Sequence, residues 1–157
     1  MEVDDPAVVD VIRRCMVARI ATLSSNGRPS INPLYFIYLN GHIWLGTADW
    51  TLAARNVKAD PRVSVLFEVE QARADQRILR ISGRACVNTD QKVQRLNERL
   101  SARKYVLTPG GLRNYLTNFR LLRPMHDYHA QSAAKGLACV IDVTPEHAEF
   151  QIAGCGG

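Results

Sequence analysis

The sequence has no apolar segment long enough to cross a membrane and no basic, apolar leader. Its longest apolar stretch, residues 33–39, has the length of a strand, whereas a spanning helix needs about 20 apolar residues. The N-terminus opens with acidic residues instead of the basic start and apolar run of a signal peptide. We therefore predict a cytoplasmic protein with no membrane partner.

Paired cysteines are also missing. Cys15, Cys86, Cys139 and Cys155 lie far apart and form no C-x-x-C motif, so we expect reduced thiols in a cytoplasmic chain. Cys86 and Cys139 fall in apolar runs and are predicted to be small core residues, whereas Cys155, beside the terminal glycines, is predicted to be exposed.

Familiar catalytic signatures are absent as well. There is no G-x-S-x-G, P-loop, H-E-x-x-H or Rossmann glycine pattern, which leaves hydrolase and phosphotransfer chemistry without support. His126 and His129 have a spacing that permits ligation on one helical face, but no second pair of ligands lies near them in the sequence. We predict no metal site and keep haem at these histidines as a minor alternative.

The features that are present describe one domain, residues 1–157, with an ordinary share of apolar residues (46%). The net charge of +5 suits an anionic ligand. Arg95, Arg99, Arg103 and Lys104 form a basic series on a predicted helix. We interpret it as a solvated face and predict no nucleic-acid partner, because the chain lacks a recognition motif.

Alternating apolar residues and turn signals predict seven strands, at residues 17–23, 30–39, 42–47, 62–68, 77–87, 137–143 and 147–152. Asn-Gly turns join the first three strands. Helices are predicted to start at Asp5-Pro6, to run from Asp49 to Ala59 and from Thr89 to about Lys104, and to restart at Thr108-Pro109.

The strand at residues 30–39 is apolar on both faces. Ile31, Leu34 and Phe36 are assigned to one face, and Tyr35, Ile37 and Leu39 to the other. A strand that is apolar on both faces needs cover on both. A barrel interior covers one face, and we expect a second subunit or a helix to cover the other, which favours a homodimer.

Residues 18–68 carry an ordered set of short motifs. They are A-T-L, a turn, G-x-P, N-P-L-Y-F, a second turn, I-W-L, a short helix ending in R-N, and D-P-R-V; residues 77–85 add R-I-L-R-I-S-G-R-A. This series resembles the pyridoxamine 5′-phosphate oxidase-like superfamily. The resemblance implies a mainly β (α+β) fold, an antiparallel split β-barrel with short helices and a helical insertion before the last hairpin. It also implies a homodimer with FMN or coenzyme F420 in grooves at the interface; some relatives bind haem and others have lost the cofactor.

The resemblance implies a site with two parts. The cofactor ring would lie against Asn32, Pro33, Leu34 and Tyr35, and the phosphate end near Thr47, Trp50, Thr51, Leu52 and Arg55, with Asn56 and Arg80 close by. A helix N-terminus at Trp50 suits a phosphate because its amides are unpaired. The chain departs from the family where a Ser-x-Lys is usual, because Ala53 takes the place of the lysine. Arg55, Arg28, Arg77 or Arg80 could supply the missing charge.

The leading hypothesis is an oxidoreductase that transfers hydride to or from a small unsaturated or aromatic substrate. No catalytic side chain is assigned, because the cofactor carries the hydride chemistry in such enzymes. One alternative is a non-catalytic protein that binds a flavin or haem, and another is a dimeric interaction protein without a cofactor. Arg55 and Asn56 could also simply cap and solvate a surface helix.

Overall fold

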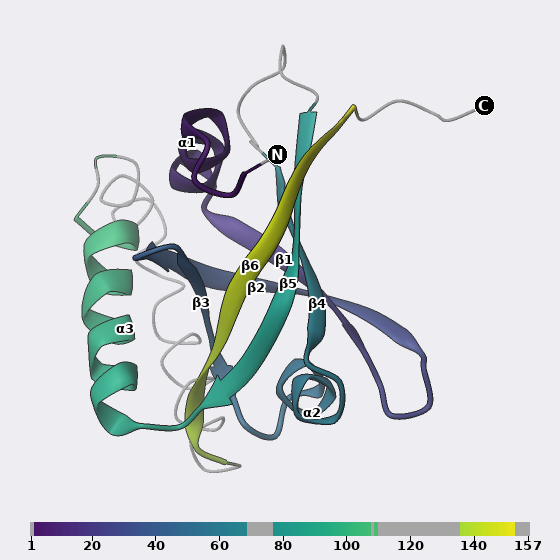
Figure 1. Cartoon of the computed structure of the whole chain (residues 1–157). Coiled ribbons are helices and arrows are strands. Elements are labelled where there is room, and N and C mark those ends of the chain that lie inside the picture. Colours follow the sequence, from purple (N-terminus) through teal and green to yellow (C-terminus); the bar gives the residue numbers. More distant parts are fainter. Residues whose placement is uncertain (1, 69–76, 108, 110–135, 153–157) are drawn as a thin grey trace, which may run out of the picture.

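The computed structural model describes residues 2–68, 77–107, 109 and 136–152. Within them, six antiparallel strands close a barrel in the order β1-β2-β3-β6-β5-β4. The elements are α1 (Pro6–Arg14), β1 (Val17–Leu23), β2 (Pro29–Leu39), β3 (His42–Ala48), α2 (Leu52–Ala59), β4 (Arg62–Glu68), β5 (Arg77–Asn88), α3 (Gln91–Tyr105) and β6 (Ala138–Ile152). The predicted mainly β split-barrel class is confirmed (Figure 1).

Alternating side chains fill the barrel. Ile20, Val65, Ile81 and Ala148 pair in one row across four neighbouring strands, and all four are fully buried. Successive residues of a strand point to opposite faces, so the period-two pattern of the sequence places this row inside. The interior is therefore a packed apolar core, as the alternation predicts.

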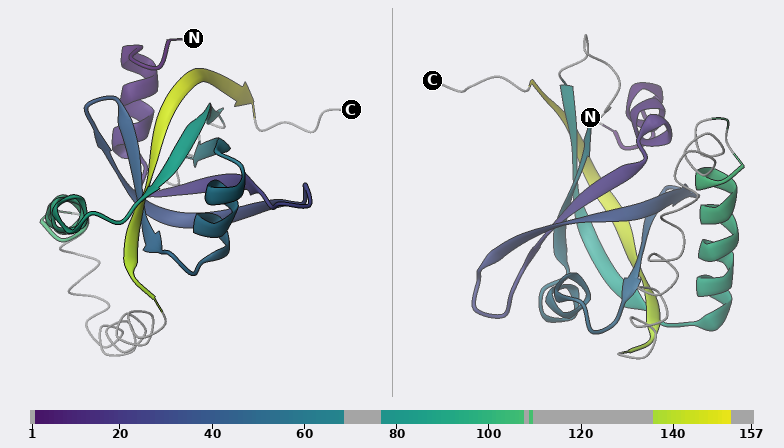
Figure 2. Two further views of the ribbon diagram at one scale, coloured as in Figure 1. Left: turned by 60° about the horizontal axis from the view of Figure 1, so that its bottom comes forward. Right: turned by 180° about the vertical axis from the view of Figure 1, so that it is seen from behind.

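The helices take three different positions around the barrel. Figures 1 and 2 show α1 and α2 at opposite ends, while α3 runs along the outside. Asp5 caps α1 by accepting a hydrogen bond from the Ala7 amide at 2.8 Å, as predicted. The bare backbone of Gly46 on β3 lets the Asn97 side chain of α3 approach closely, since an added Cβ would lie 3.1 Å from its Nδ2.

Two predicted helix starts were placed too early. Thr51, and not Asp49, is the N-cap of α2, and Asp90, and not Thr89, is the N-cap of α3. Asp49 is used elsewhere, because its carboxylate accepts a hydrogen bond from the Leu137 amide at 3.0 Å. The predicted helix after Thr108-Pro109 lies outside the described residues, apart from Pro109 itself.

The C-terminal end differs from the predicted hairpin. Residues 138–152 form one continuous strand, β6, so the described barrel has six strands and not seven. Pro145 sits at a shift in the β5–β6 register between Ser82 and Gly83, and a bulge tolerates a residue without an N–H. Gly83 permits the bulge, since a Cβ there would lie 2.3 Å from the Thr144 carbonyl oxygen.

The two predicted tight turns are confirmed. Gly27 has φ +78°, and both Asn40 and Gly41 have positive φ (51° and 82°), the backbone of a hairpin turn that matches strand twist. Among the thiols, Cys139 is buried as predicted, but Cys86 is exposed. Cys86 lies on the outer face of β5 because its neighbour Ala85 points inward. Cys155 lies outside the described residues.

Among the helices that the structure describes, none is long and apolar enough to serve as a membrane span.

Candidate functional site

The barrel is split between β2 and β3. β2 pairs with β1 from Pro29 to Tyr35, but with β3 only from Phe36 to Leu39. Beyond Leu45, β3 keeps its pairing with β6, which runs from Ile43 to Ala48, but no longer pairs with β2. Figures 1 and 2 show the two strands diverging, and they leave one edge of β2 without a neighbouring strand.

The direction of the β2 peptide groups follows from Phe36. Its N–H and C=O bond to the Tyr105 hydroxyl, which also reaches the Met16 carbonyl just before β1. The Phe36 peptide groups therefore point toward the β1 side. Because these groups alternate along a strand, those of Ile31, Pro33 and Tyr35 point to the open edge. Pro33 suits this edge, since it has no N–H to leave unpaired.

The four predicted ring-lining residues do not share one surface. Asn32 and Leu34 pair with the inward-facing Ile20 and Ala18, whereas Pro33 and Tyr35 are exposed on the outer face. A planar ring placed on either face could touch only two of these side chains. A ring at the open edge would instead meet the peptide groups of Pro33 and Tyr35. Ile31 was predicted to share a face with Leu34 and Phe36. It lies instead on the outer face with Tyr35.

Asn32 has an unusual environment. Its Nδ2 atom is buried and has no hydrogen-bond partner in the described structure. A buried amide donor without a partner is unfavourable, so it marks a position where an added acceptor would be accommodated. Among the predicted ring-lining residues, Asn32 is thus the one whose side chain has a buried donor without a partner.

Two threonines meet at the N-terminus of α2. The Thr51 hydroxyl donates to the Ala48 carbonyl at 2.8 Å and accepts from the Ala54 amide at 3.4 Å. Since its only proton is used there, the 3.1 Å contact with Thr47 must be donated by Thr47. Thr51 is therefore committed to capping the helix. It has no proton left for a phosphate.

The exposed surface around this helix start is formed by Trp50, Leu52 and Arg55. Trp50 packs closely on Gly136, where an added Cβ would lie 2.7 Å from the indole. Ala53, which replaces the family lysine, is only 2% exposed and belongs to the core. Position 53 therefore offers no charge, and Arg55 is the predicted cation that this surface does present.

Asn56 is anchored inside the chain and does not face the open surface. It is 4% exposed, and its Nδ2 donates to the Thr22 and Ser30 hydroxyls at 3.0 and 3.1 Å. Those hydroxyls also lie 3.0 Å from each other. The sequence interpretation missed Thr22 and Ser30. Their role is to attach α2 to the β1–β2 hairpin, which fixes the position of the helix start relative to β2.

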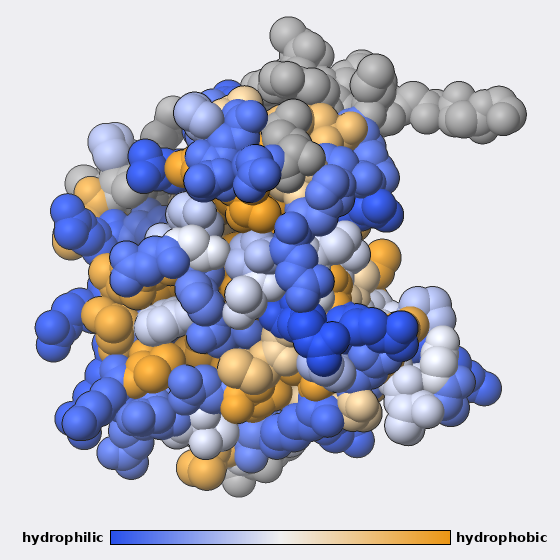
Figure 3. All heavy atoms as spheres, viewed as in Figure 1, coloured by the Kyte–Doolittle hydropathy of each residue, from blue (hydrophilic) through white to orange (hydrophobic). Residues whose placement is uncertain are grey.

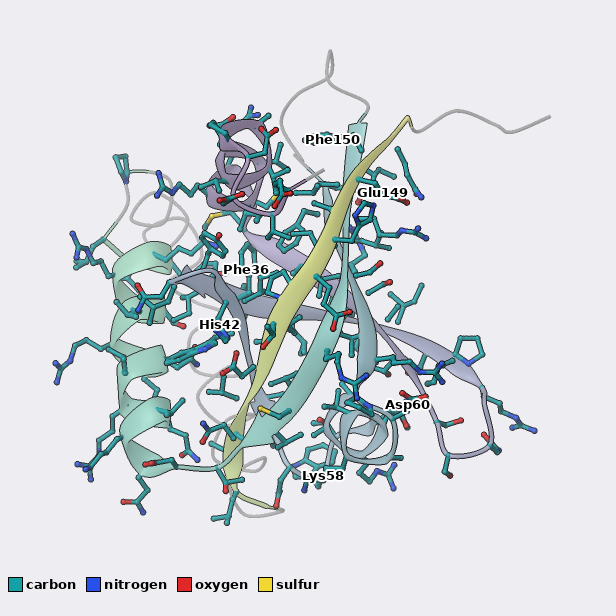
Figure 4. The ribbon with its side chains drawn as sticks, viewed as in Figure 1. Phe36, His42, Lys58, Asp60, Glu149 and Phe150 are labelled. Carbon is teal, nitrogen blue, oxygen red and sulfur yellow. The ribbon has the colours of Figure 1, made fainter. Side chains whose placement is uncertain are left out.

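Arg80 lies apart from the helix start. It sits on β5, and its guanidinium forms a 2.6 Å ion pair with Glu149. Figure 4 shows Glu149 toward the α1 end of the barrel, while Lys58 and Asp60, which mark α2, lie at the other end. Arg80 is therefore not brought together with Arg55. Arg28 is exposed on the β1–β2 turn, and the side chain of Arg77, like His126 and His129, lies outside the described part.

A thiol lies close to Thr47, in the predicted phosphate-binding part of the site. Cys139 pairs with Thr47 across β3 and β6, and burial raises the pKa of its thiol to about 11. The thiol therefore stays protonated at neutral pH and is a poor nucleophile. Its role here is packing.

A hollow of about 520 Å³ lies elsewhere, lined by the N-terminal segment, the β2–β3 turn and β6. Glu2, Asp4 and Glu146 contribute to its wall, and it contains none of the predicted site residues. Carboxylates around a hollow disfavour a phosphate. The split is the better candidate for an anionic cofactor.

Three comparisons place the chain among known proteins. The family model described as pyridoxamine 5′-phosphate oxidase matches residues 4–152. No curated protein matches.

Solved structures with similar folds share low sequence identity. A conserved hypothetical protein from Mycobacterium tuberculosis has a TM-score of 0.69 at 18% identity, covering 95% of this chain and 84% of that one. An F420 reductase has a TM-score of 0.62 at 17% identity, covering 89% and 94%. HutZ, the heme storage protein from Vibrio cholerae, has a TM-score of 0.63 at 15% identity, covering 94% and 93%. At these identities the likeness establishes the fold.

Proposed function

Because this chain belongs to the pyridoxamine 5′-phosphate oxidase family, we propose that it is an oxidoreductase that holds FMN or coenzyme F420 in the split between β2 and β3. Its substrate would be a small unsaturated or aromatic molecule. The observation that carries the proposal is the open edge of β2, which is tied to α2 through the hydrogen bond from Asn56 to Ser30.

The ring end of such a cofactor fits the residues present. A flavin or deazaflavin ring needs hydrogen-bond donors and acceptors along one edge, and the open edge supplies the peptide groups of Ile31, Pro33 and Tyr35. Asn32 adds a buried donor without a partner. The bound cofactor would supply the hydride chemistry, while the protein orients the ring and excludes water.

The phosphate end fits less completely. The first-turn amides at Leu52 and Ala53 have no intrahelical acceptors, and Arg55 adds a charge beside them. Losing the family lysine at position 53 removes a charge-assisted contact worth about 1.5–3 kcal/mol. We therefore expect Arg55 to carry most of the phosphate affinity that a side chain provides.

A homodimer is part of the proposal. Ile31 and Tyr35 are 59% and 60% exposed in the single chain. Figure 3 shows apolar side chains reaching the surface at several separate places, interleaved with polar ones. Covering the outer face of β2 with a second subunit would bury both side chains and would close the split from outside.

The test is a parallel titration of purified protein with FMN, coenzyme F420 and haem, followed by absorbance and fluorescence. We expect tight binding of FMN or F420 and at least ~tenfold weaker binding by Arg55→Ala. Lys58→Ala, an exposed cation on the same helix, is the matched control and should leave the affinity unchanged. Equal losses in both variants would contradict the site assignment. Thr51 is unsuited to this test, because its substitution would remove the helix cap.

A second function is favoured by Ala53, which leaves the family's phosphate cation missing. The chain would then bind a flavin or haem without turnover. This alternative predicts tight binding combined with no reduction of any candidate acceptor by the reduced complex, whereas the oxidoreductase predicts turnover.

A further inference from the structure

The last turn of α3 is fastened to β2 where the split begins. The Tyr105 hydroxyl accepts from the Phe36 amide at 3.0 Å and lies 2.7 and 2.9 Å from the carbonyl oxygens of Met16 and Phe36. β1 pairs with β2 only as far as Val17 and Tyr35. The hydroxyl therefore occupies the place of the next rung of the β1–β2 ladder and continues it through a side chain.

Lys104 makes a second attachment on the same residue. Its Nζ donates to the Phe36 carbonyl at 3.2 Å and lies 3.4 Å from the centre of the Phe36 ring. A cation over an aromatic face is attracted to it. Figure 4 labels Phe36 on the side of the barrel beside α3. Phe36 is itself 1% exposed and packs edge-on against Phe67, so the attachment reaches the core.

The same turn of α3 also contacts the side chain of Tyr35, whose peptide groups face the open edge. The rings of Tyr35 and Tyr105 lie 4.9 Å apart at 65°, an edge-to-face contact. Tyr35 is the last residue of the open edge before β2 joins β3. No other described aromatic ring stacks on Tyr35, so Tyr105 is its neighbour of that kind within the described chain.

We propose that Tyr105 and Lys104 are positioning residues. They hold β2 at Tyr35 and Phe36, where the split from β3 begins, in the shape that binds the cofactor. The proposal rests on the proposed function. A strand edge without a neighbouring strand lacks the ladder that would fix it, so local opening is easy unless another element holds it. Here α3 supplies that restraint through the opposite edge of β2, at Phe36, from a distance of 69 residues in the sequence.

Conservative variants separate positioning from folding. Tyr105→Phe removes the hydroxyl but keeps the ring against Tyr35, and Lys104→Met removes the charge but keeps the chain length. Arg103→Met, an exposed residue on the same turn, is the matched control. Two readouts apply at a temperature well below unfolding: cofactor dissociation constant by titration, and amide hydrogen exchange of the apo protein by mass spectrometry.

We expect Tyr105→Phe to bind the cofactor ~tenfold more weakly and to exchange ~fivefold faster in peptides covering residues 31–37, with β4 unchanged. Arg103→Met should match the wild type in both readouts. If the wild type binds a cofactor and Tyr105→Phe binds it within twofold, the proposal is overturned, even if the melting temperature falls. If the wild type binds none of the cofactors, the proposed function fails, and unchanged exchange at residues 31–37 would then overturn the restraint itself.

Discussion

The two sides of the barrel differ in how completely their strands are paired. β5 is paired along its whole length with β6, and β4 along its whole length with β5. β2 pairs with β3 over only Phe36–Leu39. On the paired side, hydrogen bonds and buried side chains together fix each strand. On the split side, β2 has only β1 as a neighbour from Pro29 to Tyr35, so its other edge is left without a neighbouring strand.

This difference shows how a barrel can keep a binding edge without losing its shape. β2 is held by a helix at each end of the stretch whose edge is open. Asn56 of α2 bonds to Ser30 at one end, and Tyr105 of α3 bonds to Phe36 at the other. An unpaired strand edge invites association with another chain. Here the two helices hold the strand in place, and Pro33 removes one donor from its open edge.

The largest effect should come from the paired side. Ile81→Ala removes a fully buried side chain at the centre of the four-strand row, and we expect a loss of about 2–5 kcal/mol in the free energy of unfolding. Ile31→Ala at the open edge should change it by less than about 0.5 kcal/mol in the monomer. Urea denaturation measures both. Equal losses would mean that the open edge is packed as tightly as the core.

Two strands with one buried face were predicted best from the sequence. Strands with one buried face alternate strictly, so Val17–Leu23 and Arg62–Glu68 were predicted to the residue. Alternation also carries information about faces. On β5, Arg84 is exposed and Ala85 is buried, and by the same rule Cys86 belongs outside, although its apolar neighbours suggested the core.

The errors arose where local signals compete with tertiary pairing. Thr144-Pro145-Glu146 has turn composition, yet the long pairing with β5 absorbs it as a bulge that Gly83 permits. Candidate site residues near one another in sequence lie together around the start of α2, and their binding role stays a prediction. The contribution of Tyr105 could not be predicted, because nothing in its surrounding sequence indicates which distant strand its hydroxyl meets.

The next effect concerns the anchor at the α2 end. Asn56→Ala would leave the Thr22 and Ser30 hydroxyls without their shared donor, and we expect a loss of about 1–3 kcal/mol in unfolding free energy. Asn56→Asp replaces the donor by a buried carboxylate, so it should lose at least as much. Chemical denaturation distinguishes the two. An Asn56→Ala variant as stable as the wild type would mean that water replaces the amide.

The smallest effect is a pH dependence of stability that comes from Lys104, which binds β2 at Phe36. Burial lowers the pKa of Lys104 to about 8, and Cys15 opposes that shift only weakly. An unfolded lysine keeps its ordinary pKa near 10.4, so between about pH 8 and 10 the unfolded chain binds more protons than the folded one. This group's contribution to stability must therefore rise with pH across that window. Burial also raises the pKa of Tyr105 to about 12, so its hydroxyl stays protonated throughout.

The measurement compares unfolding free energies at pH 7.5 and 9.5 under reducing conditions. Unfolded cysteines ionise in this window and lower stability as the pH rises, so the net slope of the wild type is not diagnostic. Lys104→Met should lose the favourable part, which leaves its stability about 1 kcal/mol further below the wild type at pH 9.5 than at pH 7.5. Arg103→Met should run parallel to the wild type. If Lys104→Met also runs parallel, the Lys104 ammonium is held charged by the Phe36 ring and carbonyl, and the attachment of α3 to the open edge is independent of pH.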